Sequence, residues 1–126
     1  EMYIRDRDSG WELHVGGNGG IKTEVARFLV KVTTAEEVRE YTGAFLQLYR
    51  EQAYYLDRTV HYIARVGLDY IRAQVVDDAA NRRALYERLL YSLEGLVDPW
   101  KARIAGERRQ EYQPLRIAAP AATVEE

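Results

Sequence analysis

Cysteine is absent from this chain of 126 residues, which excludes disulfides, zinc clusters and cysteine-ligated iron–sulfur clusters formed by the chain alone. No apolar run approaches the ~20 residues that a helix needs to span a bilayer. The formal net charge is only −2, so composition gives no electrostatic reason to expect nucleic acid or an anionic membrane as a partner. The two histidines, His14 and His61, do not complete a metal site, so we predict neither metal ligands nor catalytic residues.

The composition that is present is typical of a soluble globular protein, with 47% hydrophobic and 30% charged residues. The length suits one domain or part of a larger one. No signal peptide opens the chain, and together with the lack of cysteine this predicts a cytoplasmic protein. Because the first residue is Glu1 rather than methionine, we expect the chain to be a piece of a longer protein.

A glycine-rich stretch at residues 15–23, Val-Gly-Gly-Asn-Gly-Gly-Ile-Lys-Thr, is the most unusual feature of the sequence. Four of the nine glycines fall within five positions of this stretch, whereas a tight turn needs only one or two. Glycine lets a backbone approach another body closely, so the stretch is either a structural turn or a loop that seats a flat or anionic ligand. Lys22 either pairs with that anion or is simply solvated. The candidate ligand-binding residues are Gly16, Gly17, Asn18, Gly19, Gly20 and Lys22.

The residues before this stretch predict a β-hairpin. Residues 2–5 are a strand candidate, Asp8-Ser9-Gly10 is a turn signal, and residues 11–15 alternate apolar and polar side chains. The alternation predicts a half-buried strand with three side chains facing the core, namely Trp11, Leu13 and Val15.

The rest of the chain predicts a mainly helical body. Thr23 is expected to cap a helix in which Val25, Phe28 and Leu29 share a face, an order of elements that would present free backbone amides to an anion. A capping box at residues 34–37 begins a helix to about Tyr54, and Gly43 inside it predicts close packing against another element. Further helices are expected over 56–64, 68–76, 79–93 and 100–105. Gly67 is expected to cap the C-terminus of the first, Asp77 or Asp78 the N-terminus of the third, and Asp98 the N-terminus of the last. The predicted fold is α+β: a hairpin and loop over 2–22, a helical region over 23–105, and a poorly ordered tail over 106–126.

Outside the glycine-rich stretch, we favour structural interpretations. His61 and Arg65 share a helix face that either meets a carboxylate-bearing partner or is an ordinary polar face, and we favour the latter. The many tyrosines are expected to be partly buried with surface hydroxyls. Arg82 and Arg83 are expected to lie on a solvated face.

Residues 8–23, Asp-Ser-Gly-Trp-Glu-Leu-His-Val-Gly-Gly-Asn-Gly-Gly-Ile-Lys-Thr, resemble the segment after the iron–sulfur cysteines in the large subunit of assimilatory NAD(P)H-dependent nitrite reductases. Residues 43–51, 55–70 and 98–101 resemble the same subunit, in the same order and spacing. The resemblance covers residues 6–105, whereas the wider sirohaem nitrite and sulfite reductase family shares mainly the Gly-Gly-Asn portion.

The resemblance implies a parent that reduces nitrite to ammonium in nitrate assimilation, with electrons passing from NAD(P)H through FAD and iron–sulfur centres to a sirohaem coupled to a [4Fe–4S] cluster. It implies that residues 1–105 are the C-terminal portion of the sirohaem domain, and that the candidate residues of the glycine-rich stretch form one wall beside the carboxylate-bearing sirohaem. The implied partners are the remainder of the large subunit and the small subunit. Because the family's four cluster cysteines lie upstream and are absent here, we expect the isolated chain to hold no cofactor and to be inactive.

The residues alone also fit a stand-alone helical interaction module with a structural glycine-rich loop. A hairpin cut from its parent is expected to expose apolar surface near residues 11–15 and to support a homodimer through it.

Overall fold

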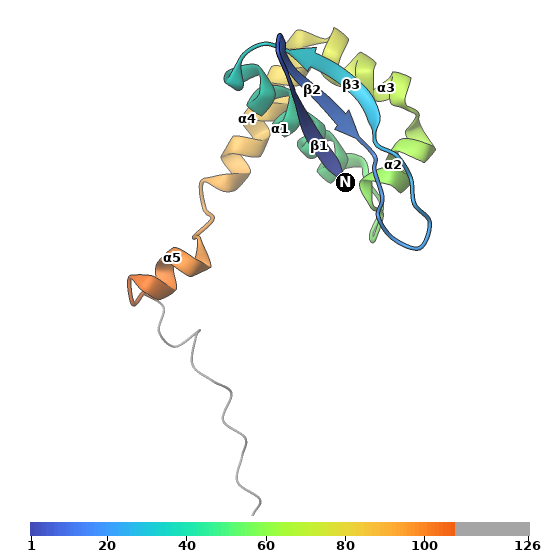
Figure 1. The fold of residues 1–126 in the computed structure, drawn as a ribbon. Helices are drawn as coiled ribbons and strands as arrows, with labels where there is room; N and C mark the ends of the chain where they lie inside the picture. Colours follow the sequence, from blue (N-terminus) through green and yellow to red (C-terminus); the bar gives the residue numbers. More distant parts are fainter. Residues whose placement is uncertain (108–126) are drawn as a thin grey trace, which may run out of the picture. The chain divides into compact units, whose positions relative to one another are not determined.

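The computed structural model describes residues 1–107, which fall into two units, residues 1–94 and the segment from Gly95 onward (Figure 1). The first unit begins with three strands and continues with helices, so the predicted α+β architecture is confirmed. Its elements are β1 (Met2–Arg7), β2 (Gly10–Val15), β3 (Arg27–Val32), α1 (Ala35–Gln52), α2 (Thr59–Val66), α3 (Leu68–Arg72), the π-helix η1 (Ala73–Asp77) and α4 (Ala79–Leu93).

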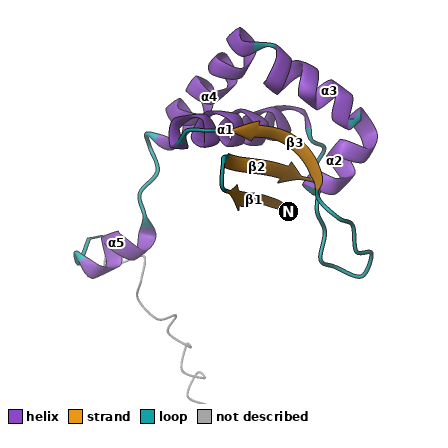
Figure 2. Cartoon of the chain, turned by 45° about the horizontal axis from the view of Figure 1, so that its top comes forward, coloured by secondary structure: helices purple, strands orange, loops and turns teal. Residues whose placement is uncertain are grey.

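The strands form one antiparallel sheet in the order β1-β2-β3, and the helices lie on one side of it (Figure 2). Leu13 and Val15 of β2 are completely buried, as the alternation predicts. His14, on the opposite face, stacks on Tyr3 with ring centroids 4.7 Å apart and meets the edge of Phe28 at 5.7 Å. The helices cover Leu13 and Val15, whereas Tyr3 and Phe28, which pair with His14, are 45% and 44% exposed. The homodimer through this region stays a prediction.

The glycine-rich stretch leads into a strand, and the predicted helix capped by Thr23 is wrong. β3 pairs with β2, with a bulge between Leu13 and His14, and places Leu29 and Val32 in the buried layer. The Arg-Phe-Leu-Val-Lys-Val segment is rich in β-branched and aromatic residues, and pairing with an existing strand outweighs a short run of helical spacing. The amides of a helix N-terminus are therefore not available to an anion here.

The later helices follow the sequence signals closely. The hydroxyl of Thr34 accepts a hydrogen bond from the Glu37 N–H at 3.2 Å, and the Glu37 carboxylate accepts one from the Thr34 N–H at 3.0 Å, which confirms the capping box. Gly67, with φ 85°, ends α2, and Asp78 caps α4. A Cβ on Gly43 would lie 2.5 Å from the ring of Tyr86 in α4, so the predicted close packing is confirmed.

Acid sensitivity is expected at the start of α1. The backbone N–H groups of Thr33 and Thr34 hold the pKa of Glu37 below its ordinary value of 4.5. Since the folded-state pKa is lower than the unfolded one, this carboxylate stabilises the fold above the unfolded pKa, and the contribution is lost as pH falls through the folded pKa. Denaturation at several pH values should show a shallower acid loss of stability for Glu37→Gln than for the wild type. Glu36→Gln, which removes none of these hydrogen bonds, is the control, and matching acid profiles for Glu37→Gln and the wild type would contradict the prediction.

Arg82 does not lie on a solvated face, and that prediction is wrong. Its side chain is 13% exposed and its Nε lies 2.9 Å from the Glu40 carboxylate. Its Nη1 donates to the carbonyls of Val75 and Val76 at 3.0 Å each, and the guanidinium lies 4.1 Å from the ring centroid of Tyr41. One arginine of α4 therefore joins α1 to the end of η1.

The second unit contains α5 (Pro99–Ile104), which begins as predicted. The Asp98 carboxylate accepts hydrogen bonds from the N–H groups of Trp100 at 2.9 Å and Lys101 at 3.2 Å. The predicted poorly ordered tail over 106–126 lies outside the described residues from 108 onward. Within the described range, every helix is too short or too polar to cross a membrane.

Candidate functional site

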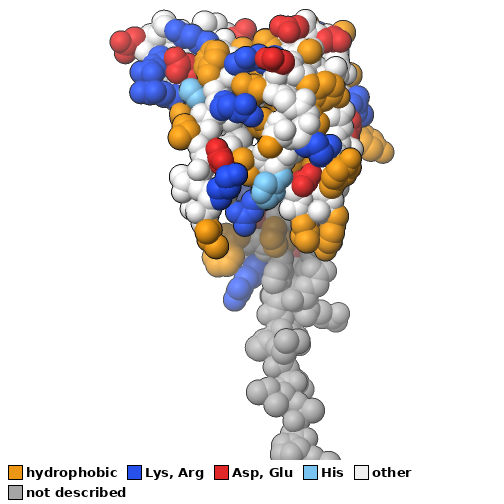
Figure 3. Space-filling view, turned by 90° about the vertical axis from the view of Figure 1, so that its right-hand side faces the viewer, with side chains coloured by type: hydrophobic (Ala, Val, Ile, Leu, Met, Phe, Trp, Pro, Cys, Tyr) orange, Lys and Arg blue, Asp and Glu red, His pale blue; other side chains and the backbone are white. Residues whose placement is uncertain are grey.

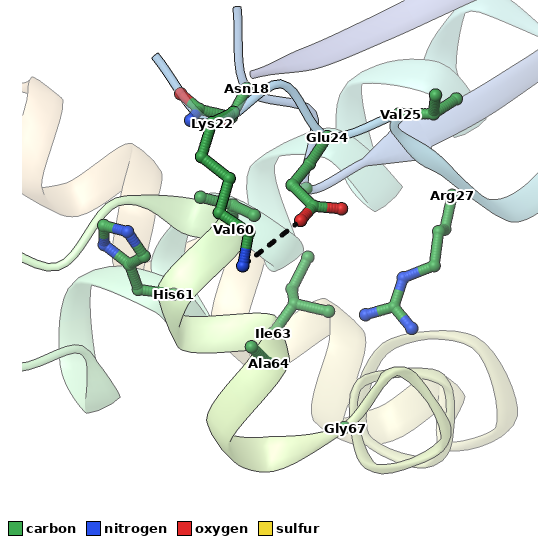
Figure 4. Close-up of a pocket in the computed structure, with 11 residues that line it drawn as sticks. Asn18, Lys22, Glu24, Val25, Arg27, Val60, His61, Ile63, Ala64 and Gly67 are labelled. Atoms are coloured by element: carbon green, nitrogen blue, oxygen red, sulfur yellow. Dashed lines mark hydrogen bonds and ion pairs between the residues drawn. The ribbon is translucent and has the colours of Figure 1, made fainter. Parts of the chain in front are cut away.

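A groove of about 450 Å³ opens between the β2–β3 connection and α2 (Figure 4), and we refer to it as the loop–α2 groove. Its volume lies in the range of small-molecule sites. The connection contributes Gly16, Asn18, Lys22, Glu24, Val25 and Arg27 to its lining. Across from them, α2 contributes Val60, His61, Ile63 and Ala64. The structure thus brings three of the predicted residues, Gly16, Asn18 and Lys22, to one groove.

Residues 16–18, in the first half of the glycine-rich stretch, have a conformation or hydrogen bonds that the fold itself requires. Gly16 has φ 81°, and a Cβ there would lie 2.8 Å from the Cδ1 of Ile63. The Gly17 N–H donates to the Glu1 carbonyl at 3.0 Å, and Asn18 exchanges two backbone hydrogen bonds with Glu24, each 2.9 Å. Any contact of Gly17 or Asn18 with a ligand must therefore use an atom other than the backbone N–H.

Gly19 and Gly20, in contrast, contribute little to the hydrogen bonding of the described fold. Within residues 1–107 neither amide has a hydrogen-bond partner, and neither residue has a positive φ. A Cβ on Gly20 would meet nothing closer than 3.6 Å, and one on Gly19 would meet only the flexible Glu1 carboxylate at 3.0 Å. The fold therefore requires glycine at Gly20 neither for conformation nor for space.

Two cations line the loop–α2 groove, and among the described residues only one of them has an acidic partner. The Nζ of Lys22 lies 3.7 Å from the Glu24 carboxylate, in an exposed pair that water and salt screen. The side chain of Arg27, at the start of β3, has no ion pair or hydrogen bond within the part of the chain that the structure describes. The groove therefore presents a guanidinium without an acidic partner in the described residues. The sequence does not indicate it, because the spacing around residue 27 predicts a helix and the structure has a strand.

The wall of the groove that α2 forms is anchored to the rest of the fold through Tyr62. Tyr62 is completely buried, and its hydroxyl donates to the Gln52 side chain at 2.7 Å. Burial raises the pKa of Tyr62 to about 12, with Tyr70 adding to the rise and Arg65 opposing it. The side of α2 that lines the groove is therefore fixed, because Tyr62 anchors the helix from its buried side.

His61 is exposed, as the favoured interpretation predicts, but it also lines the loop–α2 groove. Its Nδ1 accepts a hydrogen bond from the Arg58 N–H at 3.4 Å, which leaves Nε2 without a partner among the described residues. Arg65 does not form a shared polar face with His61, since its guanidinium pairs with the Asp57 carboxylate at 3.3 Å and stacks over the ring of Tyr54. Sequence spacing could not show that His61 and Lys22 share a groove.

A second hollow of about 500 Å³ lies beside the first and shares Asn18 with it, and Gly19, Gly20, Arg58 and Thr59 also line it. Arg58 donates to the side-chain oxygen of Asn18 at 3.4 Å, and the Asn18 amide donates to the Lys22 carbonyl at 2.7 Å. Over residues 1–107 no group of three or more His, Cys, Asp or Glu side chains could hold a metal ion. The face shown in Figure 3 carries basic, acidic and apolar side chains intermingled rather than a surface of one charge.

Comparison with known proteins gives a consistent result. Residues 2–83 match the nitrite and sulphite reductase 4Fe-4S domain. The chain is 49% identical over 94 residues to nitrite reductase [NAD(P)H] of Bacillus subtilis (strain 168), covering 75% of this chain and 12% of that protein. It is 31% identical over 103 residues to the nitrite reductase (NADH) large subunit of Escherichia coli (strain K12), covering 79% and 12%.

A more distant similarity is 27% identity over 81 residues to the assimilatory-type sulfite reductase of Nitratidesulfovibrio vulgaris, covering 60% of this chain and 37% of that protein. No solved structure matches the chain. The chain therefore spans only about an eighth of the length of the two nitrite reductases, at 12% each.

Proposed function

The chain belongs to the nitrite and sulphite reductase 4Fe-4S domain family, and from this premise we propose that it is a C-terminal part of the large subunit of an NAD(P)H-dependent nitrite reductase. The parent would be a cytoplasmic oxidoreductase that reduces nitrite to ammonium in nitrate assimilation. Residues 1–105 would complete its sirohaem domain. The names of the two nitrite reductases support this assignment, and no observation favours a stand-alone interaction module.

The chain would supply a wall of the cofactor pocket and not its redox centre. It contains no cysteine, so it does not fit the [4Fe–4S] cluster, whose ligands must come from elsewhere in the parent. FAD, the NAD(P)H site and the small subunit would also lie outside it. We therefore expect the isolated chain to be inactive.

Sirohaem, in contrast, fits the residues that are present. When bound, it supplies the iron at which electrons reach the substrate. The observation that carries the proposal is that Gly20 is glycine although the described fold does not need it, in a segment where the Gly19 and Gly20 N–H groups have no partner among residues 1–107. A bare backbone with free N–H groups can lie against a flat ring and donate to its carboxylates. The candidate sirohaem-side residues remain Gly16, Gly17, Asn18, Gly19, Gly20 and Lys22.

Gly20→Val in the full-length large subunit tests this assignment. A Cβ at Gly20 would meet nothing closer than 3.6 Å and no positive φ is needed there, so the subunit should fold normally, but the added side chain would stand where the ring approaches. We expect sirohaem per subunit, measured by extraction and Soret absorbance, to fall at least severalfold. The matched control is Gly95→Val, at a position where a Cβ meets nothing within 4 Å, and it should retain sirohaem. Full sirohaem content in Gly20→Val would exclude the loop as a wall of the pocket.

A further inference from the structure

We propose that Arg27 and His61 hold carboxylates of the bound ring from opposite sides of the loop–α2 groove, above an apolar floor formed by α2. This inference rests on the proposed function and adds two residues that the sequence resemblance does not assign.

Arg27 is the best placed cation for a carboxylate. The Lys22 ammonium already has the Glu24 carboxylate within 3.7 Å, whereas the Arg27 guanidinium has no ion pair or hydrogen bond in residues 1–107. A guanidinium can bind a carboxylate through two parallel N–H donors, which a lysine ammonium cannot do. Figure 4 shows the Arg27 side chain extending from β3 toward the space beside Ile63 and Gly67.

His61 offers a donor on the other side of the groove. Because its Nδ1 accepts the Arg58 N–H, the neutral ring carries its proton on Nε2, the nitrogen without a partner among the described residues. The same hydrogen bond fixes the ring at the first turn of α2. Figure 4 places His61 and Arg27 on opposite sides of the groove, with Lys22 and Ile63 between them.

The surface between these two donors is apolar. Val60, Ile63 and Ala64 line the α2 side, and Val25, which is 81% exposed, lines the facing side. Burying such surface under a flat ring is favourable, and polar groups at the two sides would fix the ring's orientation. The occupant that matches this chemistry is a planar apolar ring with carboxylates at its periphery.

The test measures how fast sirohaem leaves the full-length large subunit, followed as loss of Soret absorbance with an excess of a tetrapyrrole-binding acceptor protein. Losing one charge-assisted hydrogen bond corresponds to roughly a tenfold change in affinity, so Arg27→Gln should lose sirohaem about tenfold faster. His61→Gln should lose it several times faster, and Arg27→Lys should lie between the wild type and Arg27→Gln. The matched control is Arg39→Gln, an exposed arginine on α1, which should behave as the wild type.

The other outcomes separate the inference from the function it rests on. Wild-type loss rates in Arg27→Gln and His61→Gln, together with sirohaem depletion in Gly20→Val, would overturn the inference and leave the proposed function standing. Retention of sirohaem in all three variants would overturn both. A fall in the unfolding temperature of the sirohaem-free subunit in Arg27→Gln, as large as in the loaded subunit, would show a purely structural role and also overturn the inference.

Discussion

Gly43→Val is expected to lower the free energy of unfolding of the first unit by about 3 kcal/mol, at the upper end of the cost of overpacking a well-packed interface. A Cβ at this position would lie 2.5 Å from Cδ2 of Tyr86 and 3.1 Å from Cδ2 of Leu89. Both contacts belong to α4, so the two longest helices would have to separate or shift along each other. Urea denaturation followed by circular dichroism measures the change.

Two companion variants make the cause specific. Gly43→Ala should also destabilise, because its Cβ meets the same ring, but by less than Gly43→Val, since alanine favours the helix by up to about 1 kcal/mol over glycine and adds no further methyl groups. Adding Tyr86→Ala to Gly43→Val should make the double variant less destabilised than the sum of the two single changes, since the second removes the ring that the valine meets. A midpoint for Gly43→Val equal to that of the wild type would refute the predicted clash.

Arg82→Met is expected to cost about 2–4 kcal/mol, although methionine retains most of the length and apolar stem of arginine. The change leaves the Glu40 carboxylate, which is 25% exposed, without its cation, and removes the donor to the carbonyls of Val75 and Val76. Those carbonyls lie in η1, where the five-residue spacing of a π-helix departs from the α-helical ladder. Denaturation should show the loss, and hydrogen exchange should show the largest increase in residues 73–78.

The neighbouring residue provides the control. The side chain of Arg83 is exposed and has no ion pair or hydrogen bond within residues 1–107, so Arg83→Met should change the stability by less than about 0.5 kcal/mol. Equal effects of the two substitutions would mean that net charge, and not the contacts of Arg82, determines the result.

The helical half of the fold was predictable because its signals are local. The Thr34–Glu37 capping box, Gly67 and Asp78 each satisfy backbone groups a few residues away, and the structure places each where the sequence does. Gly43 was informative for another reason, because a glycine inside a helix costs stability unless a neighbour approaches closely. Its contact with Tyr86 shows this neighbour.

The segment after the glycine-rich stretch was not predictable in this way. The spacing of Val25, Phe28 and Leu29 fits a helix over one turn, and only pairing with β2, at long sequence distance, decides for a strand. Because Arg27 lies in this segment, its place in the groove also depends on that pairing. Arg82 was missed because no local signal marks an arginine that reaches Glu40, 42 residues away, at 2.9 Å.

Division into two units has a practical consequence for spectroscopy, because each unit holds one of the two tryptophans. Trp11 lies in β2 and is partly buried, whereas Trp100 lies in α5 and is 66% exposed. Replacing Trp100 by phenylalanine would leave a single indole, and its fluorescence would report the melting of the sheet and the helices packed on it without a background from the second unit.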